Sequence, residues 1–318
     1  MANPVIDISN VVKVYKGKNA AQVRALDGLS LQVNQGEIFG LLGRNGAGKT
    51  TLLRILTTLI TPTSGAVRIL GMDIGKDALE IRRNICVVLQ ENAVELFLSV
   101  SDNLDTYARF HSISAPARRR RVDQAIEQFG LGEYRNQKVI DLSGGLKRRV
   151  QVAKVFMVDK PIIFLDEATT GMDPINKRAT IDAVRDQTRK GRTIFLTTHI
   201  LQEAEELCDT IAIIDRGKLI KSGDIHTIKS LASSALNVTM TFETLTDELL
   251  AAFNSLSHTK LEPKNNTIQM TVTGHEAEAL ELIARISRTN KLLHFEASSA
   301  TLEDAFFEVL AGSDGAGT

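Results

Sequence analysis

The chain has 318 residues, a length typical of about two domains. Its 43% apolar and 24% charged residues are ordinary for a globular protein and exclude a disordered chain or a fibre. Basic and acidic residues balance at 38 each, yet residues 1–231 carry a net charge of +7 and the remainder −7, which indicates two units.

The sequence also excludes several other classes of protein. No apolar run reaches the roughly 18 to 20 residues that a membrane helix needs, and the N-terminus lacks the layout of a secretory signal. Cys86 and Cys208 are each flanked by apolar residues, which favours two buried thiols over a disulfide or a metal site. We therefore expect a cytoplasmic protein.

The first chemical motif follows an apolar run of strand length at 37–42. Residues 43–50 read Gly-Arg-Asn-Gly-Ala-Gly-Lys-Thr and fit the phosphate-loop pattern at every position. Apolar residues then recur at helical spacing from Leu52, so a strand leads into the loop and a helix leaves it. The glycines allow backbone N–H groups to point at phosphates, Lys49 supplies a positive charge, and the Thr50 hydroxyl can bind Mg²⁺. The motif predicts a nucleotide site.

A second strand-length apolar run, at 161–165, ends in two carboxylates. The C-terminal end of a strand is where such folds present metal-binding and base groups to a ligand. We expect Asp166 to hold Mg²⁺ and Glu167 to polarise the attacking water. The phosphate loop makes this interpretation stronger than that of two solvated acids at a strand end.

Two shorter patterns complete the set of candidate sites. Leu-Ser-Gly-Gly-Leu at 142–146 precedes a helical run, with Ser143 as the expected N-cap and two glycines that permit close backbone approach to an anion. His199 follows a strand-like run at 193–198, a position where a lone histidine is more often structural. The other motifs make His199 a candidate site residue.

In this order the motifs resemble those of the ATP-binding-cassette (ABC) ATPases, over residues 5–230. Besides the motifs above, Gln90 matches the glutamine loop and residues 171–173 match the D-loop. Leu146 departs from the family, which most often has glutamine there, and Ala168 stands where proline usually follows the catalytic acid. Neither departure removes a phosphate ligand or the base.

The resemblance implies an α/β fold of the P-loop NTPase class for residues 1–231. This ABC nucleotide-binding domain would have a mixed core sheet, an antiparallel β subdomain and a helical subdomain at about 92–158. Two copies of the chain, or one copy and a close paralogue, would form an ATP sandwich. Each nucleotide would then lie between the phosphate loop of one copy and the signature, residues 142–146, of the other. ATP and Mg²⁺ are the implied cofactors.

The resemblance also implies a role for each motif residue. The catalytic residues would be Glu167, His199 and Gln90, and Gln90 would join Thr50 and Asp166 at the Mg²⁺ ion. The implied nucleotide-binding residues are Tyr15, Gly43, Asn45, Gly46, Gly48, Lys49, Thr50, Thr51, Ser143, Gly144, Gly145 and Asp173. Tyr15 would stack on adenine, although a place in the core is the alternative for this side chain.

Two helices are predicted between the glutamine loop and the signature. One spans 102–110 with Ser101 as its cap, and the other runs from Ser114 to Phe129. In the family this segment is the part that meets a membrane partner, and residues 96–98 are candidates for that contact, with core burial as the alternative. The four arginines at 118–121 cover all faces of a helix without aromatic neighbours, which favours a solvated face over a nucleic-acid surface.

The tail from residue 232 onward is acidic and rich in threonine. Its pattern predicts a small α+β domain over 232–312 in the order β-α-β-β-α-β, of ferredoxin-like type, with an added helix at 302–310. Residues 313–318 are expected to be disordered. Thr-Leu-Glu-Asp-Ala-Phe at 301–306 resembles a motif in the C-terminal extension of daunorubicin-resistance type exporter ATPases. Regulation, dimer support and an inert stabilising cap are all open roles for this tail.

The combined prediction is the ATP-hydrolysing subunit of an ABC-type exporter. It would be attached to the cytoplasmic face of the cell membrane through a separate membrane-spanning subunit, with a drug or a lipid-like small molecule as candidate cargo. No nucleic-acid partner is expected. The alternative is a soluble ABC ATPase in assembly or repair, which the lack of a second cassette or a coiled-coil insert disfavours. Glu167 and His199 disfavour a module that binds ATP without hydrolysing it.

Overall fold

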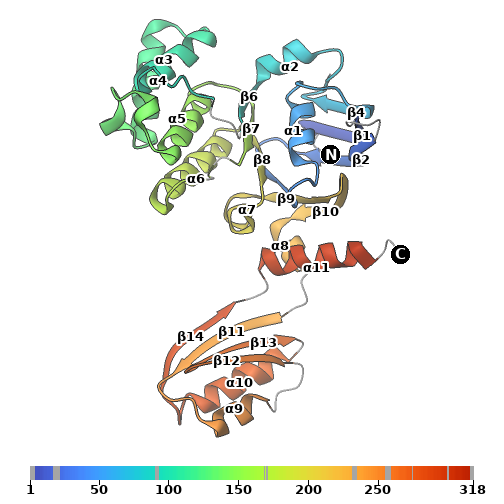
Figure 1. The fold of residues 1–318 in the computed structure, drawn as a ribbon, viewed down its shortest axis with the longest axis vertical. Helices are drawn as coiled ribbons and strands as arrows, with labels where there is room; N and C mark the ends of the chain where they lie inside the picture. Colours follow the sequence, from blue (N-terminus) through green and yellow to red (C-terminus); the bar gives the residue numbers. More distant parts are fainter. Residues whose placement is uncertain are drawn as a thin grey trace. The chain divides into compact units, whose positions relative to one another are not determined.

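The computed structural model describes residues 4–16, 22–89, 93–167, 169, 171–230, 235–254, 259–273, 275–298 and 301–315 (Figure 1). The chain divides into two compact units, Met1–Gly223 and Asp224–Thr318. In the described ranges, no helix is both long enough and apolar enough to cross a membrane.

A six-stranded sheet forms the centre of the first unit, in the order β10-β9-β3-β8-β7-β6. β3 pairs in parallel with β8 and β9, and β7 pairs in parallel with β6 and β8. Every residue of β3, β7 and β8 is buried, as expected for parallel strands covered on both faces. The strands are β3 Ile38–Leu42, β6 Ile85–Val88, β7 Ile162–Asp166, β8 Thr193–Thr198, β9 Thr210–Asp215 and β10 Lys218–Asp224.

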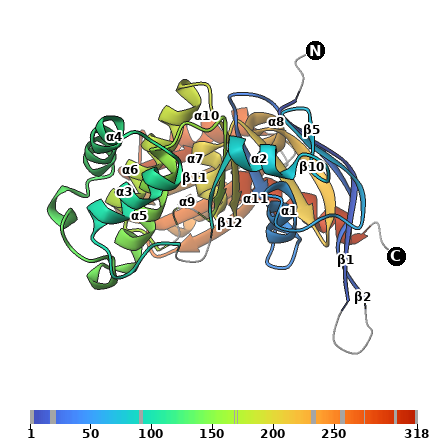
Figure 2. The ribbon, with the colours of Figure 1, turned by 90° about the horizontal axis from the view of Figure 1, so that it is seen from above.

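A second, antiparallel sheet in the order β2-β1-β4-β5 packs against the same core. Figure 2 shows β1 and β2 side by side as a long pair. One apolar cluster joins residues of this sheet, of β3 and of α1 (Lys49–Leu56), so the helix that follows the phosphate loop is anchored on both sheets. The strands are β1 Ile6–Lys16, β2 Gln22–Val33, β4 Ser64–Ile69 and β5 Met72–Asp73.

Helices gather on the other side of the six-stranded sheet, where α3, α4 and α5 lie together (Figure 1). The predicted cap of the first of these is wrong: Ser99, not Ser101, accepts the hydrogen bond from the Asp102 N–H, because α3 begins one residue before Ser101. Ser114 is the N-cap residue of α4, as predicted. The helices are α2 Ala78–Asn84, α3 Val100–Phe110, α4 Ala115–Gln128, α5 Gly144–Phe156, α6 Pro174–Arg189 and α7 Leu201–Leu207, with 3-10 turns at Gly132–Tyr134 and Val139–Asp141.

The second unit contains an antiparallel sheet in the order β12-β13-β11-β14. One sheet face carries Met240 and Met270 in an apolar cluster with Phe253 of α9 and Ile283 of α10. The elements follow the predicted β-α-β-β-α-β order. They are α8 Ile225–Lys229, β11 Ala235–Phe242, α9 Asp247–Asn254, β12 Thr259–Lys264, β13 Thr267–Thr273, α10 Glu276–Ile286, β14 Leu292–Ser298 and α11 Leu302–Gly315.

The C-terminal helix differs from its predicted end, and the two cysteines are as predicted. α11 contacts α8 and continues past the predicted end at 310, so residues 313–315 are helical rather than disordered. Residues 316–318 lie outside the described part of the chain. Cys86 and Cys208 are both buried free thiols, as predicted.

The aromatic core of the six-stranded sheet gives a test of the fold. Phe195 is fully buried between Phe39 and Phe164, with ring centroids 5.4 and 5.6 Å away. We expect Phe195→Ala to lower the free energy of unfolding by about 3–5 kcal/mol, because a cavity replaces those ring contacts. The matched control is Phe110→Ala, whose ring is 81% exposed and whose loss should change stability by less than about 0.5 kcal/mol. Urea unfolding measures both, and equal losses would contradict this packing.

Candidate functional site

The phosphate loop links the end of β3 to the start of α1, and its glycines are required by space and by conformation. A Cβ at Gly43 would lie 2.5 Å from the Ile214 carbonyl oxygen. Gly48, the N-cap of α1, has a φ of 111°, and a Cβ there would lie 2.7 Å from the Ala25 carbonyl oxygen. Side chains at these two positions would push the loop away from β2 and β9. The loop backbone is therefore held close to the core, with the N-terminus of α1 behind it.

The other predicted residues of the loop lie toward solvent. Asn45 and Gly46 are exposed at its tip. On the first turn of α1, Thr50 is exposed and Thr51 is half-buried. The Thr50 hydroxyl is therefore accessible to a ligand that contacts the loop.

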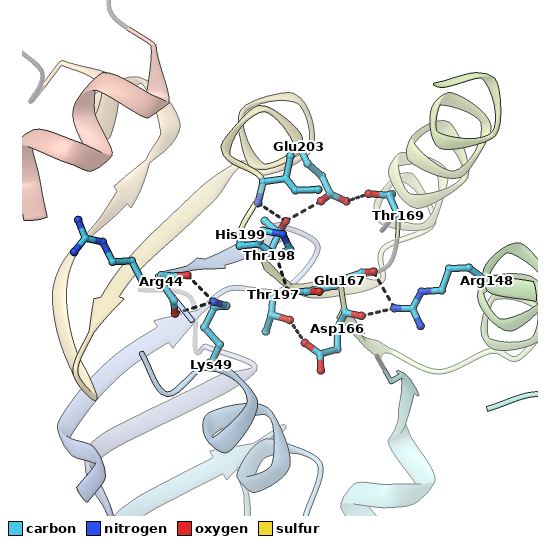
Figure 3. Close-up of polar contacts among 12 residues, drawn as sticks. Arg44, Lys49, Arg148, Asp166, Glu167, Thr169, Thr197, Thr198, His199 and Glu203 are labelled. Carbon is cyan, nitrogen blue, oxygen red and sulfur yellow. Dashed lines mark hydrogen bonds and ion pairs between the residues drawn. The ribbon is translucent and has the colours of Figure 1, made fainter. Parts of the chain in front are cut away.

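Lys49 is buried, with only 8% of its surface exposed, although it carries a charge. Its Nζ donates to the Gly43 carbonyl at 2.5 Å and to the Arg44 carbonyl at 3.2 Å (Figure 3). Burial lowers the pKa of Lys49, and the negative charges of Glu167 and Asp166 act in the opposite direction. The loop thus holds an ammonium group in the field of two carboxylates.

Asp166 is the last residue of β7 and is 6% exposed. It lies opposite Thr197 of β8, whose hydroxyl donates a hydrogen bond to its Oδ1. Burial raises the pKa of Asp166. The Thr197 hydrogen bond and the cations Arg148 and Lys49 oppose that rise, whereas Glu167 adds to it. A carboxylate oxygen at this strand end is a ligand of the kind that Mg²⁺ prefers.

Glu167 is bound at its backbone and at its side chain. Its φ is 51°, in the left-handed region, where a residue with a Cβ costs about 1–2 kcal/mol. Its N–H donates to the Thr197 carbonyl at 3.0 Å, and its own carbonyl accepts from Arg148 at 3.0 Å. Its carboxylate Oε1 lies 2.7 Å from the His199 Nδ1 (Figure 3). The side chain of Glu167 is 11% exposed and that of His199 is 46% exposed, so the pair opens to solvent through the histidine.

A buried acid on α7 supports the segments around this pair. Glu203 is 1% exposed and accepts hydrogen bonds from the Thr198 hydroxyl at 2.8 Å and the Thr169 hydroxyl at 2.5 Å. Thr198 directly precedes His199, and Thr169 follows Glu167 by two residues. The network therefore ties together the chain segments that present the two site residues.

The signature residues lie apart from the phosphate loop of their own chain. Figure 1 shows α5 and α1 with strands of the six-stranded sheet between them. Ser143 caps α5 by accepting from the Leu146 N–H at 3.3 Å, and both Ser143 and Gly144 are exposed. A Cβ at Gly145 would lie 2.9 Å from the Gly171 carbonyl oxygen, so the signature packs directly on the D-loop.

Four positions singled out in the sequence remain. Tyr15 is half-buried near the end of β1, with the Lys13 Nζ 5.3 Å from its ring centroid. Asp173 is exposed just before α6. Gln90 and Ala168 lie outside the described residues.

Sequence patterns do not reveal the residues that hold the site together. Arg148, Thr197 and Glu203 are buried and are hydrogen-bonded to the segments that carry Asp166, Glu167 and His199. For Thr197 the sequence does offer a signal, since two consecutive threonines directly precede His199. Arg148 and Glu203 each stand on a helix, where a charged residue is usually solvated, so only the tertiary structure reveals their contacts.

Comparison with known protein families and sequences gives consistent matches. Residues 26–170 match the ABC transporter family. The daunorubicin/doxorubicin resistance ATP-binding protein DrrA of Streptomyces peucetius is 35% identical over 306 residues, which cover 95% of this chain and 91% of that protein. The Nod factor export ATP-binding protein I of Cupriavidus pinatubonensis is 33% identical over 307 residues, which cover 96% of this chain and 92% of that protein. Both alignments include the C-terminal unit as well as the site.

Comparison with solved structures agrees. A dimeric ATP-binding cassette in a post-hydrolysis state, bound to ADP and Pi, is 26% identical with a TM-score of 0.64. That match covers 69% of this chain and 98% of the other. The ATP-binding subunit of an ABC transporter is 27% identical with the same TM-score, covering 71% and 92%.

The buried carboxylate gives a prediction about stability and pH. Because burial raises the pKa of Asp166, its ionised form opposes folding at any pH above that pKa, and the penalty disappears below the ordinary value of 3.8. We expect Asp166→Asn to increase the free energy of unfolding of the nucleotide-free protein at pH 7, because the asparagine carries no charge that burial penalises. The gain should shrink as the pH falls toward 4. Thermal unfolding at several pH values measures this, and an asparagine variant that is less stable at neutral pH would contradict it.

Proposed function

The chain belongs to the ABC transporter family of ATP-binding proteins, and we propose that it is the ATP-hydrolysing subunit of an exporter. One observation carries the ATPase part of the proposal. Lys49 of the phosphate loop, Asp166 and the Glu167–His199 pair meet at the carboxyl ends of the parallel strands β3, β7 and β8, where such folds bind their ligands.

The phosphate loop would bind the triphosphate of ATP. Its backbone N–H groups and the start of α1 favour negative charge, and Lys49 adds a point charge for the β- and γ-phosphates. The oxygens of Thr50 and Asp166, with Gln90 as a third proposed ligand, fit Mg²⁺, which uses few protein ligands beside phosphates and water. When bound, the ion would neutralise charge on the phosphates.

Glu167 would act on the attacking water. Its carboxylate is held on one side by His199 at 2.7 Å, and its backbone is held by Thr197 and Arg148. A carboxylate fixed in this way can accept a proton from the water as the bond to the γ-phosphate forms. His199, which is more exposed, would orient Glu167 through Nδ1 and contact the γ-phosphate through the rest of its ring.

A second copy would complete each site. Ser143 and Gly144 are exposed at the start of α5, and strands of the six-stranded sheet lie between α5 and α1, which supports a role at the nucleotide of the partner copy. Gly145 packs on the D-loop, so Asp173 could transmit the state of one nucleotide to the other. Tyr15 would stack on adenine.

The exporter part of the proposal rests on the relatives and on one surface. The relatives described above are named for drug resistance and for export, which favours transport over assembly or repair, with a drug or a lipid-like small molecule as cargo. Leu96 and Phe97 are 38% and 75% exposed, contrary to the alternative of core burial, whereas Leu98 is half-buried. We propose that they contact a membrane-spanning subunit, which would hold the chain at the cytoplasmic face of the membrane.

A trapped variant tests the whole proposal. Glu167→Gln keeps the size of the side chain but cannot take up the proton, so we expect ATP hydrolysis to fall by at least about 10²-fold. Tagged Glu167→Gln chain, expressed in its native cells and extracted from the membranes with detergent and ATP, should co-purify with a protein that has several membrane helices. The matched control is Lys49→Ala, which should recover far less of that protein because it binds ATP poorly.

Two results would contradict the proposal at different points. Hydrolysis at the wild-type rate by Glu167→Gln would remove the assigned base. If Glu167→Gln loses hydrolysis but no membrane protein co-purifies with it, the assignment as an ATPase stands and the assignment to an exporter is rejected.

A further inference from the structure

We infer that Arg148 is a positioning residue that fixes the conformation of Glu167 from the signature helix. The inference rests on the proposed function, because Glu167 is the base assigned there. Arg148 lies on α5, the helix that begins at the signature, and not in any of the motifs that bind phosphate.

Arg148 is 5% exposed, and its guanidinium connects α5 with two other segments of the first unit. Nη2 donates to two successive carbonyls at the end of β7, those of Asp166 and Glu167 (Figure 3). Nη1 donates to the Leu89 carbonyl after β6 and to the Gln151 side chain at 2.8 Å. A planar fork with several donors can serve these acceptors together, whereas an ammonium group on a flexible stem cannot reach all of them.

The contact with Glu167 matters because of the backbone conformation there. A left-handed residue with a Cβ persists only where its surroundings over-determine it. Arg148 holds the carbonyl of Glu167, Thr197 holds its N–H, and His199 holds its carboxylate. If the carbonyl is released, the peptide is free to rotate toward an ordinary φ, and the carboxylate then moves away from His199.

The charge of Arg148 suits this position. Burial alone lowers the pKa of its guanidinium, and Asp166, Glu167 and Glu203 act to keep it protonated. Arg148 in turn offsets part of the negative charge of those three acids. Truncating it would therefore disturb both the geometry and the electrostatics of the strand end.

The bond to Leu89 extends the inference to the segment before Gln90. Gln151 also donates to the Leu89 carbonyl, at 2.9 Å, so two side chains of α5 hold the end of β6. Movement of α5 would therefore act on the Leu89 and Glu167 backbones together. Through Arg148, the orientation of the base depends on the position of the signature helix.

Arg148→Lys tests this, with Arg192→Lys as the matched control. Arg192 is also buried and donates to the Phe156 carbonyl, the Gln187 side chain and Asp159, but it precedes β8, at the opposite edge of the sheet from Asp166. In the full-length chain we expect Arg148→Lys to lower kcat for ATP by about 10²-fold, the cost of a base displaced by about 1 Å. The Kd of a fluorescent ATP analogue should change by less than about 3-fold. Arg192→Lys should change kcat by less than about 3-fold.

A double-mutant cycle with Glu167→Gln separates positioning from general stability. If Arg148 acts through Glu167, then Arg148→Lys should reduce the residual single-turnover rate of Glu167→Gln by less than about 3-fold. An additive loss of about 10²-fold in that background would overturn the inference. Three other results would also overturn it: a loss of ATP affinity as large as the loss of kcat, a melting temperature so much lower that the variant is partly unfolded during the assay, or an equal loss of kcat in Arg192→Lys. If the wild-type chain hydrolyses no ATP, the proposed function fails instead, which keeps the two failures distinct.

Discussion

Four charged side chains are buried together at one edge of the six-stranded sheet, and the site depends on their mutual compensation. Taken as whole residues, Lys49, Asp166, Glu167 and Arg148 are each less than a tenth exposed. Any one of them alone would cost several kcal/mol to bury. Together, the two cations offset part of the negative charge of these two acids and of the buried Glu203 nearby. Backbone carbonyls and a threonine hydroxyl supply further hydrogen bonds. The sheet makes this possible because β3, β7 and β8 run in parallel and end at the same edge.

In this arrangement the groups expected to contact the nucleotide remain accessible to solvent. The phosphate loop tip, Thr50 and the His199 ring are exposed, whereas the groups that hold them lie underneath. The exposed signature start on α5 lies apart from the phosphate loop of its own chain, because strands of the six-stranded sheet lie between α5 and α1 (Figure 1). A second copy of the chain can therefore supply it, and one buried cluster per chain would then serve a nucleotide shared by two chains.

Much of the fold follows from local sequence signals, while the contacts that support the site do not. The strand, glycine loop and helix at 37–60 are predictable because apolar periodicity and the steric needs of glycine act over a few residues. The order of strands and helices in the C-terminal unit is predictable for the same reason. The sequence predicts the cap of α3 two residues too late, because Ser99 and Ser101 both fit a cap and only the position of the helix start decides between them. Arg148 and Glu203 have no local signal, since their partners are contributed by segments distant in sequence.

The central claim is that each ATP is bound by two chains, with the buried cluster of one and the signature of the other. A structure of the full-length Glu167→Gln chain with ATP and Mg²⁺ tests it most directly. We predict a dimer in which each γ-phosphate contacts Lys49 and His199 of one copy and Ser143 of the other. A nucleotide whose phosphates contact a single chain, with Ser143 of both copies facing solvent, would contradict the account.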